Sequence, residues 1–276
     1  MQIRTFFQPS LSNIIKIFVK IFGNARQKEL LGILKRPHYA YSLFRAADIA
    51  IYFGKNKTTI AEFGVASGDG LMNLIELSEI VTEATGVEFR IFGLDSGQGI
   101  PNIESYKDHP EMWIAGDFRM SDKEQLLKKI NDRAELIIGD IKDTVDIFVS
   151  KLSTDAPLGF ISIDTDVYTG AKHALRCLTS DVGFYNPAVT IYFDDVNFYF
   201  ANRWCGELAA IEEFNSEQQF RKIDKDRTCP GSRPFHDLVW YENMYIAHIL
   251  DHPRRTNIEE RNALDIDKHG KLIKGI

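Results

Sequence analysis

From residue 58 onward, short apolar runs alternate with longer amphipathic segments. Five of these runs have the length of buried strands: 58–63, 89–94, 135–138, 158–163 and 189–193. Apolar residues at helical spacing predict helices at 71–81, 123–129, 142–152, 170–178 and 206–214. A late, longer strand is expected within 238–249. Because strands alternate with helices, we predict an α/β fold with a doubly wound, mostly parallel sheet and helices on both faces.

The first 57 residues have a different pattern, which predicts helices and no strand. The helices are expected at 11–22, 27–34 and 39–52. We therefore expect three parts in the chain: an N-terminal helical extension or lid (1–57), a ligand-binding domain (58–250) and a C-terminal tail (251–276). Alternating residues on either side of a Lys-His-Gly sequence predict a small hairpin in the tail, at 263–273.

The first predicted helix, 11–22, is amphipathic, with Lys16 and Lys20 on its polar face. Its apolar run is about 12 residues, below the roughly 18 that cross a bilayer, so we expect no transmembrane segment. No small-residue cleavage site follows, and we expect no signal peptide. The apolar face is expected to pack on its own domain or on a second subunit, which favours a homo-oligomer. Weak contact with a membrane surface is the alternative.

The composition is that of an ordinary globular protein, with 44% hydrophobic and 26% charged residues among 276. A formal net charge of -6 gives no basic footprint, so we expect no nucleic-acid partner. The three cysteines are odd in number and none has Cys-x-x-Cys spacing. This pattern argues against a disulfide framework or a zinc site and favours a reducing compartment, so we expect a cytoplasmic protein.

A glycine-rich loop joins the first predicted strand to the helix that follows it. The glycines are Gly64, Gly68 and Gly70, in the spacing Gly-x-x-x-Gly-x-Gly. The dinucleotide fingerprint is Gly-x-Gly-x-x-Gly, so a nicotinamide oxidoreductase is disfavoured. Glu62 lies at the end of the strand. A carboxylate there suits a cationic ligand, such as a sulfonium with an α-amino group, better than a pyrophosphate.

Acidic residues also end the second and third predicted strands. Asp95 is placed to hold the two ribose hydroxyls of an adenosine, and Asp140 is placed to meet an adenine edge. Alone, each of these residues is as well explained as a helix cap or a solvated turn. Because the carboxyl ends of parallel strands meet at one rim, the combination with the glycine loop favours S-adenosylmethionine as the ligand.

Four aspartates close the fourth and fifth predicted strands: Asp164, Asp166, Asp194 and Asp195. If these strands are neighbours, the carboxylates crowd together, and two like charges about 4 Å apart repel by about 4 kcal/mol at an effective dielectric of 20. Raised pKa values, a cation of the chain such as Lys172 or Arg203, or a bound metal would offset this repulsion. A hard divalent ion with oxygen ligands, such as Mg²⁺, is the simplest answer. The alternative is that the aspartates cap the helices that follow.

These segments resemble class I methyltransferases, and most closely the macrocin O-methyltransferase family, which methylates sugar hydroxyls. The resemblance covers roughly residues 37–215 and is carried by 61–65 with Gly68, by 93–96 with 99–101, and by 139–144. It implies a seven-stranded, Rossmann-like sheet. With the strand-end residues above, it gives this cofactor-binding set: Glu62, Gly64, Val65, Ala66, Gly68, Asp95, Ser96, Gly139, Asp140 and Asp164.

The resemblance extends to the aspartates through the segment Ile-Asp-Thr-Asp-Val-Tyr at 163–168. In that family, the residues matching Asp164, Asp194 and Asp195 bind a divalent cation, and the one matching Asp166 is the general base. A sugar hydroxyl is scarcely ionised at neutral pH, so a metal and a base would both assist it. The sequence therefore predicts an S-adenosylmethionine-dependent O-methyltransferase for a sugar or glycan hydroxyl. A metal-dependent catechol-type methyltransferase and a catalytically silent S-adenosylmethionine-binding module are the alternatives.

Residues 221–233 are locally basic and contain Pro230 and Gly231. This composition predicts a solvated surface loop before the last strand, placed where it would cover the acceptor.

Overall fold

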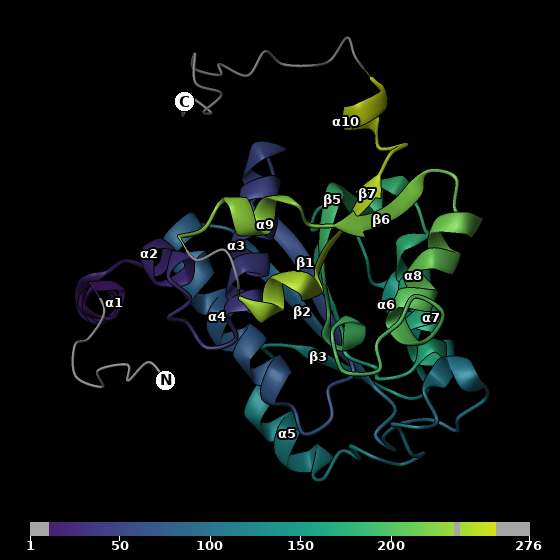
Figure 1. Ribbon diagram of the computed structural model, residues 1–276. Helices are drawn as coiled ribbons and strands as arrows, with labels where there is room; N and C mark the ends of the chain where they lie inside the picture. Colours follow the sequence, from purple (N-terminus) through teal and green to yellow (C-terminus); the bar gives the residue numbers. More distant parts are fainter. Residues whose placement is uncertain (1–10, 235–237, 258–276) are drawn as a thin grey trace, which may run out of the picture.

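A single seven-stranded sheet forms the centre of the computed structural model, which describes residues 11–234 and 238–257 (Figure 1). The strand order is β3-β2-β1-β4-β5-β7-β6. Neighbouring strands are parallel from β3 to β5, and β7 is antiparallel to β5 and β6. The predicted doubly wound, mostly parallel sheet is therefore confirmed. The strands are β1 (Lys57–Phe63), β2 (Glu88–Asp95), β3 (Glu135–Ile138), β4 (Leu158–Ile163), β5 (Tyr185–Phe193), β6 (Arg221–Lys225) and β7 (Met244–Ile249).

Helices cover both faces of the sheet. On one face lie α3 (Pro37–Tyr52), α4 (Asp69–Thr85) and α5 (Lys123–Ile130), and on the other lie α6 (Ile141–Ser150), α7 (Tyr168–Leu175) and α8 (Gly206–Glu217). Side chains of a strand alternate between faces, so Phe160 packs with α3 and α4, whereas Ile161 packs with α6 to α8. Because both faces are covered, the parallel strands are continuous apolar runs, which explains why they could be predicted.

At the N-terminus, α3 belongs to the core of the sheet domain, since Tyr39, Ala46 and Ala50 are fully buried. Before it come α1 (Leu11–Phe22) and α2 (Ala25–Leu30), which begins with a capping box at Asn24. Most apolar side chains of α1, including Phe22, are exposed, and Figure 1 shows the helix at the edge of the molecule. This helix therefore does not bury its apolar face on its own domain.

The basic segment 221–233 is not the solvated loop that the sequence predicts. Its first five residues form β6, an edge strand that pairs with β7. Arg221 is buried and pairs with Asp251, and Arg233 is buried and pairs with Glu29 of α2. An edge strand needs few apolar residues, and only Ile223 of β6 reaches the core, so the apolar pattern could not reveal it.

The remaining elements are short. They are α9 (Thr228–Gly231), α10 (Pro253–Thr256) and the 3₁₀ turns η1 (Tyr106–Asp108), η2 (Arg176–Leu178), η3 (Val182–Phe184), η4 (Asp194–Val196) and η5 (Val239–Asn243). The late strand predicted within 238–249 is shorter than expected, because η5 occupies its first half. The predicted hairpin at 263–273 lies outside the described residues. Among the described helices, none combines the length and apolar character needed to cross a membrane.

Candidate active site

A cavity of about 1050 Å³ lies at the carboxyl ends of the parallel strands. Ligands of doubly wound sheets bind in this position. Pockets for small molecules are commonly about 300–1000 Å³, so this cavity has room for a nucleoside-sized ligand and part of a second molecule. Of the predicted site residues, these line it: Gly64, Ala66, Asp95, Ser96, Asp140, Asp164, Asp166, Asp194 and Asp195.

The glycine loop brings β1 close to β4 at the cavity. Gly64 has φ +91°, and a Cβ at this position would overlap the carbonyl oxygen of Asp164. Gly70 similarly leaves room for the carboxylate of Glu62. Ala66 has a positive φ of 46°, which is unusual for a residue with a side chain. The backbone of this loop therefore packs directly against the backbone of Asp164, which follows β4.

Glu62 lies beneath this loop rather than in the cavity wall. Its Oε1 accepts a hydrogen bond from the Tyr39 hydroxyl of α3 at 2.6 Å, and that hydroxyl is 3.0 Å from the Ser162 hydroxyl. Burial raises the pKa of Glu62 to about 7, against the opposing effect of the Tyr39 hydrogen bond. Its Oε2 is buried and has no hydrogen-bond partner among the described residues. A buried acceptor without a donor is unusual in a folded protein.

Asp95 holds the glycine loop in place. Its Oδ2 accepts hydrogen bonds from the backbone N–H groups of Val65 and Ala66, both at 2.8 Å, and its Oδ1 accepts one from Gly97 at 2.6 Å. A carboxylate has about four lone-pair positions, so acceptor capacity remains for a ligand hydroxyl. Next to it, the Ser96 hydroxyl accepts from the backbone of Gln98 and also lines the cavity.

Asp140 both lines the cavity and caps a helix. Its Oδ1 accepts a hydrogen bond from the backbone of Lys142 at 2.9 Å, so Asp140 is the N-cap of α6. The sequence left a helix cap open as the alternative explanation of Asp140. The structure has this cap, and Asp140 also lines the cavity. Gly139, which precedes it, has φ +149° and leaves room for Thr144. Gly68 lies against Leu126 of α5, outside the cavity wall.

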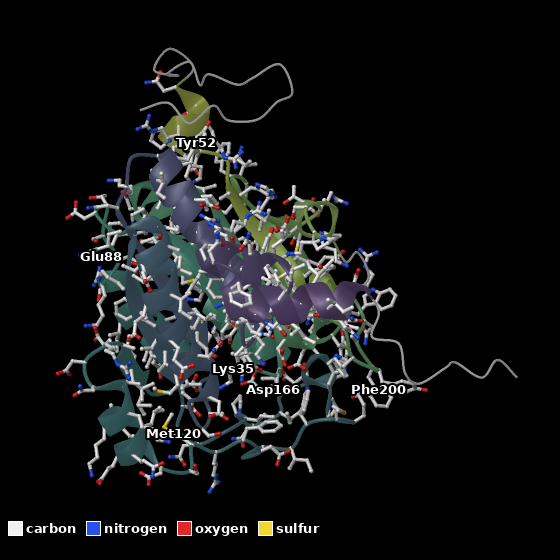
Figure 2. The ribbon with its side chains drawn as sticks, turned by 90° about the vertical axis from the view of Figure 1, so that its left-hand side faces the viewer. Lys35, Tyr52, Glu88, Met120, Asp166 and Phe200 are labelled. Carbon is white, nitrogen blue, oxygen red and sulfur yellow. The ribbon has the colours of Figure 1, made fainter. Side chains whose placement is uncertain are left out.

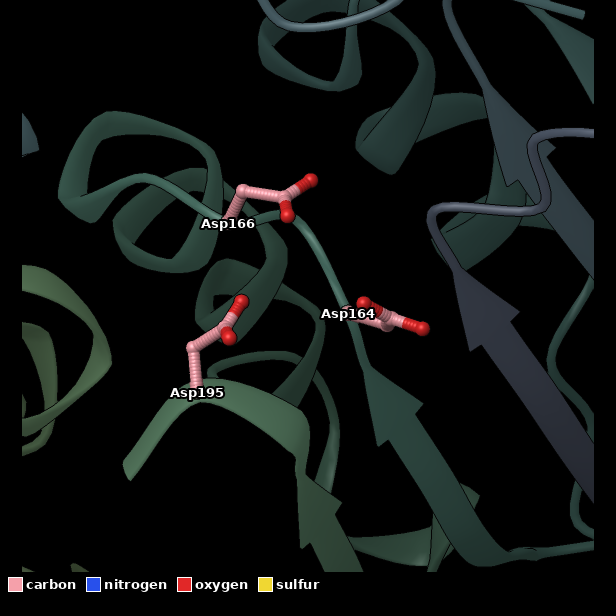
Figure 3. A group of neighbouring side chains, drawn as sticks. All are labelled: Asp164, Asp166 and Asp195. Carbon is pink, nitrogen blue, oxygen red and sulfur yellow. The ribbon is translucent and has the colours of Figure 1, made fainter. Parts of the chain in front are cut away.

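Three carboxylates of the cavity wall meet beside the glycine loop, where Gly64 adjoins the backbone of Asp164. Asp164 directly follows β4, Asp166 lies two residues later with φ +61°, and Asp195 lies in the turn after β5 (Figure 3). One oxygen of each lies within 4.8 Å of an oxygen of each of the others. Burial and the neighbouring charges raise the pKa of Asp166 to about 7, that of Asp195 to about 8, and that of Asp164 well above its usual value.

Asp194, which the sequence predicts as a metal ligand with Asp164 and Asp195, lies outside the three closest carboxylates, but its charge contributes to the raised pKa of all three. Its side chain is exposed, and its Oδ1 accepts a hydrogen bond from the Tyr192 hydroxyl at 2.6 Å. The chain turns through η4 directly after β5, so two consecutive aspartates take different directions. The structure instead groups Asp166 with Asp164 and Asp195.

Neither cation that the sequence offers neutralises the group. Lys172 pairs with Glu213 at 3.1 Å, and Arg203 pairs with Glu212 at 2.7 Å. A further carboxyl group, which the sequence did not single out, adjoins the aspartates. Glu207 of α8 is fully buried and accepts a hydrogen bond from the backbone N–H of Asp195, and burial and the charge of Asp195 raise its pKa well above the usual value. No pattern marks Glu207, because an acidic residue in the first turn of a helix is ordinarily solvated and favoured by the helix dipole.

The aspartate group fits a hard divalent cation. Its donors are all carboxylate oxygens, which Mg²⁺ and Ca²⁺ prefer. Asp195 Oδ2 is buried without a hydrogen-bond partner among the described residues, as expected for an oxygen that a cation would satisfy. A bound cation would also offset the repulsion that raises the three pKa values.

Comparison with known proteins shows the fold. No protein-family model matches the chain. No curated protein matches it by sequence. A crystal structure of the calicheamicin methyltransferase CalS11 covers 88% of this chain and 95% of its own, with a TM-score of 0.52 and 16% sequence identity. This likeness identifies the class I methyltransferase, Rossmann-like fold.

Two further structures are similar at lower TM-scores. The apo structure of CalS11, described as a TDP-rhamnose 3'-O-methyltransferase, covers 88% of this chain and 96% of its own at 17% identity, with a TM-score of 0.44. An O-methyltransferase from Bacillus cereus in complex with SAH covers 85% of this chain and 97% of its own at 13% identity, with a TM-score of 0.43.

Proposed function

We propose that this chain is an S-adenosylmethionine-dependent O-methyltransferase that methylates a hydroxyl of a sugar or of a glycosylated metabolite. The observation that carries the proposal is one cavity that is lined both by the glycine loop and by the group of Asp164, Asp166 and Asp195. The fold shared with CalS11 supports a methyltransferase, and the resemblance of the aspartate segment to the macrocin family supports a sugar acceptor.

On the cofactor side, S-adenosylmethionine would supply a methyl group already activated by its sulfonium. The loop residues Gly64, Val65, Ala66 and Gly68 would receive its amino-acid part. The remaining members of the set would surround its positive charge and its adenosine: Glu62, Asp95, Ser96, Gly139, Asp140 and Asp164. A wall rich in carboxylates suits this cationic ligand better than it suits a dinucleotide.

On the acceptor side, Asp166 would accept the proton of the acceptor hydroxyl while the oxygen takes the methyl group. Asp164 and Asp195 would hold a divalent cation, whose chemistry when bound is to lower the pKa of a neighbouring hydroxyl. Asp166 protrudes from the loop after β4 toward the same space, so it is placed to act beside the cation (Figure 3). Asp194 also lines the cavity, but in this proposal its carboxylate accepts a hydrogen bond from the Tyr192 hydroxyl and does not hold the cation.

A methyl-transfer assay tests the proposed function. Purified protein is incubated with methyl-labelled S-adenosylmethionine, Mg²⁺ and a panel of glycans and natural-product glycosides, with catechols as a second panel. We expect label on a sugar hydroxyl. Label on catechols alone would favour the catechol-type reaction. Calorimetric binding of S-adenosylmethionine without transfer to any acceptor in either panel would favour a silent binding module.

Replacing Glu62 tests the cofactor side. If Oε2 of Glu62 accepts from the ligand's ammonium group, Glu62→Gln should weaken S-adenosylmethionine about 10- to 100-fold, the range for a charge-assisted hydrogen bond. The folded pKa of Glu62 is raised, so its carboxyl stabilises the fold below the unfolded pKa and loses this contribution as pH rises through about 7. Glutamine is neutral throughout, so the variant should melt no lower than the native protein at pH 8.5.

Calorimetry and thermal melting give the two readouts. Glu76→Gln, at an exposed position of α4, is the matched control and should change neither. Unchanged affinity in Glu62→Gln would leave Glu62 with a purely structural role beneath the loop.

The apolar face of α1 supports a homo-oligomer. Ile17, Phe18, Ile21 and Phe22 are each at least 60% exposed, which is unusual for the surface of a monomer. We propose that a second copy covers this face in a cytoplasmic protein, and light scattering should give a mass above the 31.5 kDa of one chain. A strictly monomeric mass would refute this. Sedimentation of such a monomer with anionic lipid vesicles would favour the membrane surface instead.

A further inference from the structure

The turn that carries Asp195 lies just beyond the sheet. The pairing of β5 with β7 and β4 ends at residues 192–193, and η4 follows directly. After η4 the chain enters a loop in which Tyr199 is 93% and Phe200 is 44% exposed, and Figure 2 shows Phe200 at the same end of the molecule as Asp166. Because strand pairing has ended and an exposed loop buries little surface, the direction of Asp195 depends on side chains from other elements.

Asn243 holds the carbonyl side of this turn. It is the last residue of η5, directly before β7, and it is buried. Its Nδ2 donates hydrogen bonds to the backbone carbonyls of Phe193 at 2.6 Å and of Asp194 at 2.7 Å. An amide group has two N–H donors, so this one side chain can hold both carbonyls. The second of them, the carbonyl of Asp194, belongs to the peptide group that leads into Asp195.

Glu207 holds the N–H side of the same peptide group. Its Oε2 accepts a hydrogen bond from the backbone N–H of Asp195 at 2.9 Å, and its side chain is fully buried in the first turn of α8. One peptide plane is therefore held at its oxygen by η5 and at its nitrogen by α8, two elements that are distant in the sequence. The backbone of Asp195 lies near the sparsely populated bridge region, with φ -103° and ψ 28°, a conformation that surrounding contacts have to maintain.

Asp195 differs from Asp164 in how its backbone is held. The backbone N–H of Asp164 donates to the carbonyl of Phe63 at 2.9 Å, so β1 still supports this residue after β4 has ended. The backbone N–H of Asp195 bonds to the Glu207 side chain instead. Asp195 Oδ2 is buried without a hydrogen-bond partner among the described residues, so no such bond orients this oxygen. Because a site must hold its ligands to within about 0.5 Å, the backbone contacts of Asp195 bear directly on cation binding.

We infer that Asn243 and Glu207 are positioning residues, which direct the Asp195 carboxylate toward the proposed cation by fixing the peptide group before it. We call these two side chains the Asp195 clamp. The inference rests on the proposed function and adds to it two residues that hold a ligand rather than the cation. Neither residue lines the cavity, so neither is placed to touch the acceptor or the cofactor.

Cation affinity tests the clamp without any acceptor. The full chain is titrated with Mn²⁺, which takes the same oxygen ligands as Mg²⁺, and the free ion is measured by its paramagnetic resonance signal. Asn243→Leu removes both hydrogen bonds to the carbonyls and should raise the Kd for Mn²⁺ about 10- to 100-fold, the range for groups that orient metal ligands. The affinity for S-adenosylmethionine, measured by calorimetry without metal, should not change.

A pair of variants at Glu207 isolates the other hydrogen bond of the clamp. Glu207→Gln and Glu207→Leu both remove the carboxyl group, but glutamine retains an oxygen that can accept from the Asp195 N–H. Because the two variants have the same charge, the difference between their Kd values reports the hydrogen bond. We expect Glu207→Gln to bind Mn²⁺ at least about tenfold more tightly than Glu207→Leu.

Asn215→Leu is the matched control. Asn215 lies about two turns further along α8 than Glu207, and its side chain bonds to both the backbone N–H and the carbonyl of Ile223, each at 2.7 Å. It is therefore another side chain that holds backbone groups, but it does not line the cavity. Its replacement should lower Tm, as Asn243→Leu should, and leave the Kd for Mn²⁺ unchanged.

Three results would overturn the inference and leave the proposed function intact: native Mn²⁺ affinity in folded Asn243→Leu, equal Kd values in the two Glu207 variants, or an equal rise of the Kd in Asn215→Leu. If Asn243→Leu does not fold, the Glu207 pair decides. Native protein that methylates a sugar but binds no Mn²⁺ would overturn the inference together with the cation. Native protein that methylates no sugar would contradict the proposed function itself.

Discussion

Asp166→Asn is expected to lower methyl transfer by about 10²- to 10⁴-fold, the range over which a positioned general base contributes. The variant should bind S-adenosylmethionine as the native protein does, because Asp166 is not a member of the proposed cofactor-binding set. Asparagine has nearly the same shape as aspartate and also tolerates the left-handed backbone at φ +61°. The loss can therefore be assigned to the missing proton acceptor rather than to a displaced loop. Steady-state turnover and calorimetric cofactor affinity, measured together, are the two readouts.

The chain provides a matched control for this substitution. Asp132 is also an aspartate in the left-handed region, at φ +59°, but it is exposed and does not line the cavity. Asp132→Asn should retain full turnover. If Asp166→Asn retained full turnover as well, Asp166 would not be the base.

Features that follow from strand periodicity were accessible to sequence analysis. Buried parallel strands are apolar throughout, so the ends of β1, β4 and β5 could be located to within a few residues, and with them Gly64, Asp164 and Asp195. The rule that ligands bind at these ends then predicted the cavity. In contrast, β6 is a charged edge strand with one core residue, Ile223, so its sequence resembles that of a loop.

Features that depend on turns and on distant packing were not accessible. The sequence predicts that all four aspartates crowd together, but which three lie closest depends on the direction of the chain after β4 and in η4. The contact of Glu207 with Asp195 brings α8 against the end of β5. Tyr39 reaches Glu62 only because α3 packs across the sheet. No local pattern encodes these contacts, since each depends on how complete elements pack.

Mg²⁺ is expected to stabilise the protein and chelation to abolish its activity. An ion that binds only the folded state at 100 times its Kd adds about 2.7 kcal/mol to the free energy of unfolding. For a chain of this size, that corresponds to a rise of roughly 5–10 °C in Tm. The physical reason is the uncompensated group of Asp164, Asp166 and Asp195, whose mutual repulsion a cation would relieve. Thermal melting with and without Mg²⁺ detects this independently of any acceptor.

Substitutions distinguish the proposed cation ligands, Asp164 and Asp195, from the neighbouring aspartates. Asp164→Asn and Asp195→Asn should remove most of the Mg²⁺-dependent rise in Tm, because each loses a charged oxygen ligand. Asp194→Asn should keep most of it, since the Asp194 carboxylate accepts from Tyr192 and lies outside the group. Loss of the rise in Asp194→Asn would support the ligand set that the sequence predicts, and its loss in Asp166→Asn would make Asp166 a ligand as well. Full activity after exhaustive chelation would show that the aspartates are not a catalytic metal site, because a hydroxyl that reacts without the ion does not depend on it to lower its pKa.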